Sequence, residues 1–149
     1  MEEEFDEEVP MLQVEGLSDR PDYYLRLLTY LSNSTSSEFG LTLLIGGRLV
    51  TGTLIPMQMY LSELANSIAP AEAVQENAGS SLADYFREVS KSIQAQAVDN
   101  ETYEVESTAH IHLRDAVVFS TQPRGINIGL WRGRLASVEG WTLGVLNGS

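Results

Sequence analysis

Two histidines at alternate positions are the first residues whose spacing could support chemistry. His110 and His112 are the only histidines of the chain. On a β-strand, side chains two residues apart point to the same face, so these imidazoles could share one metal ion. A mononuclear site needs three or four ligands, and the chain has no cysteine to supply one. The remaining ligands would have to be carboxylates near in sequence: Asp99, Glu104, Glu106 and Asp115.

A simpler interpretation leaves the two histidines without a metal. Ile111 and Leu113 would face the core, while His110 and His112 face solvent or a neighbouring strand. The nearby carboxylates follow no recognisable ligand spacing. We therefore predict no metal and no cofactor.

Catalytic motifs are missing from the sequence. It contains neither the Gly-x-Ser-x-Gly elbow of hydrolases nor the His-Glu-x-x-His helix of metalloproteases. The frequent glycines near the C-terminus lack the Gly-Lys-Ser/Thr ending of a phosphate loop. With 21 acidic residues in the chain, pairs of carboxylates carry no information. The sequence predicts a protein that is not an enzyme.

Tryptophan and arginine gather near the C-terminus, and these residue types are enriched at protein interfaces. If Glu139-Gly140 is a two-residue turn, residues 129–138 and 141–146 form a hairpin in which Val138 pairs with Trp141. Two arginines would then share one face with Trp141. In the alternative, both tryptophans lie in the core and the arginines pair with surplus acidic residues. The candidate binding surface consists of Arg124, Trp131, Arg132, Arg134 and Trp141.

Composition and charge limit the classes of function. A chain of 149 residues with 43% hydrophobic and 20% charged residues is typical of one globular domain. The acidic N-terminus is unlike a signal or transit peptide, and no apolar run reaches membrane-spanning length, so we expect a cytoplasmic protein. The net charge of −12 argues against nucleic acid and membrane surfaces as partners.

Charge is also spread unevenly along the chain. Residues 1–108 hold 19 acidic and 5 basic side chains, whereas residues 109–149 hold 2 acidic and 4 basic ones. Such asymmetry can favour self-association or an acidic partner. A sheet end with few exposed acids would give the same pattern.

The order of elements predicts an α+β fold. Residues 1–16, with six acids in the first eight, are expected to be a disordered tail, followed by a single domain over 17–149. A hairpin over 39–55 turns at Gly46-Gly47 and leaves its threonines on an outer face. About four strands follow residue 102, in an antiparallel sheet that could curl into a small barrel. About three helices would pack on it: 21–32 capped by Ser18 or Asp19, 56–70 ended by Pro70, and 82–97 after a Ser81–Asp84 capping box.

Three segments resemble the gas vesicle accessory protein U family. They are FGLTL, GTLI and YLSE between residues 39 and 63, AHIHLRDA at 109–116, and the most specific one, WRGRLASVEGWTLG, at 131–144. The resemblance implies a small cytoplasmic protein without catalytic residues, which assists vesicle assembly or vesicle–vesicle association. Its implied partners are the vesicle shell or other gas vesicle proteins, with homo-oligomers as a further option. The alternative is an unrelated small-barrel module that binds a peptide or ligand.

Overall fold

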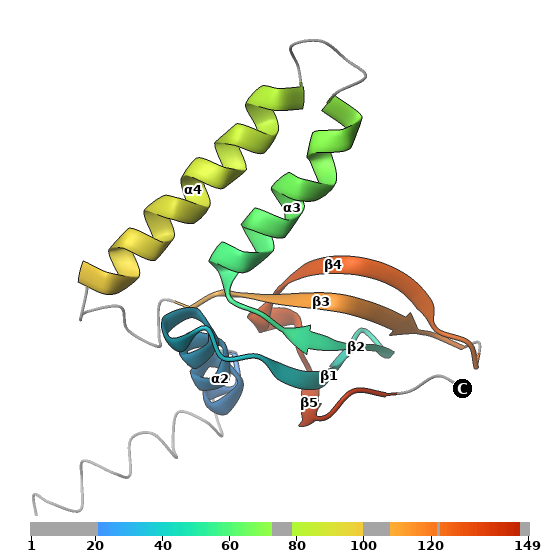
Figure 1. Cartoon of the computed structure of the whole chain (residues 1–149). Coiled ribbons are helices and arrows are strands. Elements are labelled where there is room, and N and C mark those ends of the chain that lie inside the picture. The colour runs from blue at the N-terminus through green and yellow to red at the C-terminus, as the bar shows by residue number, and fades with distance from the viewer. Residues whose placement is uncertain (1–20, 73–78, 100–107, 122, 147–149) are drawn as a thin grey trace, which may run out of the picture.

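The computed structural model describes residues 21–72, 79–99, 108–121 and 123–146 (Figure 1). Five antiparallel strands form one sheet in the order β4-β3-β2-β1-β5. The expected α+β fold is confirmed, and the sheet stays open instead of closing into a barrel. In chain order the elements are α2 (Tyr23–Thr35), β1 (Phe39–Ile45), β2 (Arg48–Leu54), α3 (Met57–Glu72), α4 (Gly79–Asp99), β3 (His110–Phe119), β4 (Ile126–Arg134), the 3-10 helix η2 (Leu135–Ser137) and β5 (Gly140–Leu143).

The β1–β2 hairpin forms as the sequence predicts. Gly46 and Gly47 have φ angles of 57° and 76°, which side chains other than glycine rarely adopt. This two-residue turn matches the twist of the strands and fixes the register, with Ile45 opposite Arg48. Leucines and valine at alternate positions therefore share one face.

That face forms the hydrophobic core together with α2. Helix α2 contributes Leu25, which is fully buried, and Leu28 packs beside it. Gly52 allows β2 and β3 to approach closely, because a Cβ there would lie 3.0 Å from the carbonyl oxygen of Arg114. The other buried members of the core come from the three central strands β1, β2 and β3 and from η2 after β4: Leu41, Leu43, Val50, Leu54, Ile111, Leu113, Ala116 and Leu135.

The opposite face of the hairpin is covered at Thr42 and Thr51, in contrast to the outer threonine surface expected from the sequence, while Leu44 and Leu49 on it stay exposed. The chain after β5 crosses it: the Thr42 hydroxyl donates to the carbonyl of Gly144 at 2.8 Å. The Leu146 amide donates to the Thr51 hydroxyl at 2.9 Å. Both threonines are buried under this segment, which lies 102 residues after Thr42 and 95 after Thr51 and satisfies their hydroxyl groups.

Helices α3 and α4 form an antiparallel pair that extends away from the sheet (Figure 1). The Ser90 hydroxyl on α4 donates to the carbonyl of Gln58 on α3 at 2.7 Å. Pro70 does not end α3, since its missing N–H removes only one bond close to the helix end at Glu72. Helix α4 begins at Gly79, so Ser81 lies inside the helix and the expected capping box is wrong.

Helix α2 differs from its prediction at both ends. Its N-cap is Asp22, whose Oδ1 accepts from the Leu25 amide at 2.9 Å, and not Ser18 or Asp19. The helix continues to Thr35, because the hydroxyl groups of Ser34 and Thr35 bond back to carbonyls four residues earlier. Ser18, Asp19 and the predicted tail at 1–16 lie outside the described residues.

The C-terminal hairpin expected over 129–146 does not form. Strand β4 pairs with β3, whereas β5 pairs with β1 at the other edge of the sheet. Between them, η2 buries Leu135 in the core. The amide of Glu139 donates to the Leu44 carbonyl at 2.9 Å, and its carboxylate accepts from the Gly46 amide at 2.6 Å. These contacts with β1 and its turn carry the chain to the opposite edge.

Candidate functional site

The two histidines share one face of β3, as their spacing predicts, and each lies opposite an arginine of β4. His110 pairs with Arg134 and His112 with Arg132. The Arg132 Nε–H donates to His112 Nε2 at 3.1 Å. Of the two expected surroundings, solvent or a neighbouring strand, His112 has the strand: it is only 1% exposed, and the ring of Tyr60 on α3 also lies over it with centroids 4.7 Å apart. His110 is half-buried.

Burial and the neighbouring cation keep His112 neutral. Desolvation, then the charge of Arg132, then His110 lower the pKa of His112 to about 3. Since Nε2 accepts from Arg132, the ring proton is assigned to Nδ1, which is buried and has no hydrogen-bond partner among the described residues. The pKa of His110 is lowered too, by burial and by Arg132 and Arg134.

This arrangement does not resemble a metal site in the part of the chain that is described. No group of three or more potential ligand residues occurs there. A metal at His112 Nε2 would have to replace the Arg132 guanidinium, which is itself a cation. Asp115 is exposed at an irregularity of β3 with a φ of 54°. Glu104, Glu106 and the Asp99 side chain lie outside the described residues, so the expected absence of a metal stays a prediction.

The two tryptophans lie far apart in the sheet order and both pack against the core. Trp131 pairs with Leu113 on β3, and Gly133 makes room for its ring, since a Cβ there would lie 2.1 Å from it. Trp141 lies on β5 at the other edge, where its Nε1–H donates to Asp22 Oδ1 at 3.0 Å. The two tryptophans are partly buried and lie on opposite edges of the sheet, so they do not form one continuous surface.

The arginines, in contrast, are exposed. Arg132 and Arg134 point to the same face of the edge strand β4, and Arg124 is exposed in the loop before it. Among the described residues, the ion pairs involve Arg87, Lys91 and Arg114, and none involves these three arginines. The structure therefore leaves a basic edge, which we define as Arg124, Arg132 and Arg134.

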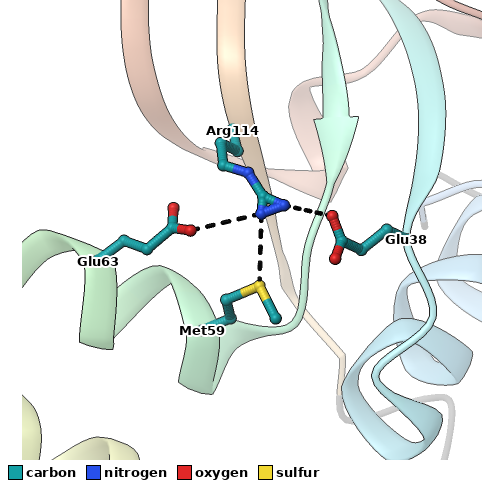
Figure 2. Close-up of polar contacts among 4 residues, drawn as sticks. All are labelled: Glu38, Met59, Glu63 and Arg114. Atoms are coloured by element: carbon teal, nitrogen blue, oxygen red, sulfur yellow. Dashed lines mark hydrogen bonds and ion pairs between the residues drawn. The ribbon is translucent and has the colours of Figure 1, made fainter.

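Arg114 forms a clamp that sequence reasoning missed (Figure 2). From β3 its guanidinium contacts three groups: the Glu38 carboxylate just before β1, Glu63 Oε1 at 3.4 Å and Met59 Sδ at 3.6 Å. The bond to Glu38 is the main reason for its raised pKa. The clamp fastens the base of α3 to the sheet and so holds Tyr60 over His112. The available signal was the four-residue spacing of Met59 and Glu63, which places both on one helix face.

The described part is thus an α+β protein in which polar contacts fasten helices to an open sheet, and its edge strand β4 carries the exposed Arg132 and Arg134 at one end, with Arg124 in the loop at the other. A family model described as gas vesicle protein GvpU-like matches residues 22–146, and the chain belongs to this family. The resemblance inferred from the sequence is confirmed. No curated protein and no solved structure matches the chain. Within the described ranges, no helix is long and apolar enough to cross a membrane.

Proposed function

We propose that this protein is a non-enzymatic accessory protein of gas vesicles that acts through protein–protein contacts at the basic edge. The family supports a gas vesicle protein, and the exposed arginines on an open edge strand support the contact surface. Its partners are the vesicle shell or other gas vesicle proteins in the cytoplasm. Its task is vesicle assembly or vesicle–vesicle association.

The basic edge is unusual because the protein around it is strongly acidic. The chain has a net charge of −12, yet Arg132 and Arg134 lie two residues apart on one face of β4. Guanidinium groups in this arrangement can bind carboxylates in a bidentate manner. Apolar side chains on the same strand, Ile126 at 63% and Ile128 at 40% exposure, add contact area. Arginine beside apolar surface is typical of protein interfaces.

The five residues of the sequence-based surface take different roles in this proposal. Arg124, Arg132 and Arg134 contact the partner. Trp131 anchors β4 from the core side, and Trp141 fastens the opposite edge to α2 through Asp22. We therefore expect the tryptophans to influence binding only through the stability of the sheet.

Co-flotation with purified gas vesicles tests the proposal. We expect the double variant Arg132→Gln/Arg134→Gln to lose most co-flotation at low salt, because two of the partner's charge contacts disappear. The matched control, Arg87→Gln/Lys91→Gln, removes the same charge from exposed positions on α4 and should float like the native chain. At 1 M salt the native chain should lose binding as well, since the Debye length falls to about 3 Å.

A second pair of variants guards against a folding defect. Arg132 donates to His112, so its replacement can affect the fold. Arg124→Gln/Arg134→Gln leaves that bond intact and should weaken co-flotation with an unchanged melting temperature. Native co-flotation of both double variants would contradict the proposed surface.

A further inference from the structure

We propose that the acidic residues 2–8 of the chain bind in cis to Arg132 and Arg134, so that the protein covers its own basic edge. This inference rests on the proposed function, because it concerns the same surface. It adds a competitor that any acidic partner must displace. The contact would make vesicle binding depend on release of the N-terminal segment.

Charge complementarity is the first argument. Residues 2–8 hold six carboxylates and no basic residue around Phe5. Arg132 and Arg134 are exposed, point to the same face and have no carboxylate partner among the described residues. Both guanidinium groups lie close enough to His110 to help burial lower the pKa of its ring. Two adjacent guanidinium groups without carboxylates are a favourable site for a run of acidic side chains.

The geometry of attachment is the second argument. The described chain starts just before Asp22, which the hydrogen bond from Trp141 fixes beside β5. Trp141 follows Arg134 by seven residues, so their Cα atoms are at most about 25 Å apart. Thirteen residues separate Glu8 from Asp22. The maximum reach of a linker of that length is above about 40 Å, which exceeds the separation of Trp141 from Arg134.

Because the linker is long enough to bridge this distance, binding within one chain is favoured over binding between chains. The effective concentration of a tethered segment is greatest when the typical length of its linker equals the distance to be bridged, and then reaches about the millimolar range. An acidic segment of a second copy would need a comparable protein concentration to compete. At such an effective concentration the contact needs a dissociation constant of only about 1 mM, or about 4 kcal/mol, which several charge-assisted bonds to the two guanidinium groups must supply together.

A spin label near the acidic segment tests the contact in the full chain. Because the chain has no cysteine, Val9→Cys gives a unique attachment site that leaves residues 2–8 intact. We expect paramagnetic broadening of the amide signals of β4 around Arg132 and Arg134, and none on α4 around Arg87 and Lys91. Broadening should persist on dilution and vanish at 1 M salt.

Variants define the result that would overturn the inference. Arg132→Gln/Arg134→Gln should abolish the broadening of β4, whereas Arg87→Gln/Lys91→Gln should retain it. Equal broadening in both double variants, or no broadening of β4 in the otherwise native chain, would refute the contact. Broadening that appears only when spin-labelled chains are mixed with isotope-labelled ones would refute binding in cis.

Flotation separates this inference from the proposed function. A variant with all six acidic residues of 2–8 changed to their amides should bind vesicles more strongly at low salt, because its basic edge is no longer covered. Unchanged binding would overturn the inference while leaving the proposed function intact. Failure of the proposed function would show instead as native flotation of the arginine variants.

Discussion

Acidification should destabilise the fold through His112 in a way that can be calculated. The pKa of this buried imidazole is lowered to about 3, against 6.5 for an ordinary histidine, mainly by desolvation. Between those values the unfolded chain binds a proton that the folded chain does not. The contribution of His112 is therefore fully present above pH 6.5 and decreases as the pH falls. The slope is about 1.4 kcal/mol per pH unit, so a change from pH 7.5 to 5 should remove about 2 kcal/mol of stability.

Denaturant unfolding of the native chain and of His112→Gln at both pH values measures this effect. Other titrating groups are common to both proteins, so the difference between their pH dependences isolates His112. The native chain should lose about 2 kcal/mol more than the variant on acidification. In a second measurement, NMR should show the His112 ring neutral at pH 5. Equal pH dependence of the two proteins, or a protonated His112 ring at pH 5, would refute this account of the Tyr60–His112–Arg132 packing.

Three substitutions test other contacts by their free energies of unfolding. Arg114→Met should cost about 1 kcal/mol, since solvent partly screens the ion pairs of the clamp. Arg87→Met, which removes an exposed ion pair on α4, should cost less than about 0.5 kcal/mol. Equal costs would contradict a structural role of the clamp. Gly52→Ala should cost about 1–3 kcal/mol, since its Cβ meets the backbone of β3. Gly40→Ala should cost less, because the nearest atom is the movable Val145 Cγ2. A larger cost for Gly40→Ala than for Gly52→Ala would contradict the close approach of β2 and β3. Trp141→Phe should cost about 1 kcal/mol, because the hydrogen bond to Asp22 is lost. The same substitution in an Asp22→Ala background should cost less, and an equal cost in both backgrounds would disprove the bond.

The parts of the fold predicted correctly depend on local signals. Gly46-Gly47 between alternating apolar residues defines the β1–β2 hairpin within 17 residues, and its register follows from the turn. Ile111 and Leu113 alternate with histidines, so their burial in the core could be predicted. Such patterns need no knowledge of the rest of the chain.

The C-terminal hairpin failed because its alternative is non-local. Glu139-Gly140 is compatible with a tight turn, yet β5 gains a full set of partners on β1, about 100 residues earlier. Leu135 is also buried in the core as part of η2, whereas the expected hairpin would have kept it on a strand. Local spacing carries no information about either contact.

In the candidate site, too, local spacing predicted some features, whereas others depend on contacts between distant segments. That Arg132 and Arg134 share a face followed from their spacing on a strand. The separation of Trp131 from Trp141 required the order of strands in the sheet. The burial of His112 depends on Tyr60 and hence on where α3 packs, which Arg114 helps to fix. The side chains that surround His112 thus come from elements distant in sequence, which local patterns do not bring together.

Hydrogen exchange on the full chain, with and without purified gas vesicles, tests the central claim most directly. The account predicts slower exchange of the β4 amides, Ile126–Arg134, when vesicles are present, with α4, Gly79–Asp99, unchanged. Protection confined to the α3–α4 pair, with β4 exchanging as in the free protein, would contradict the proposed binding surface.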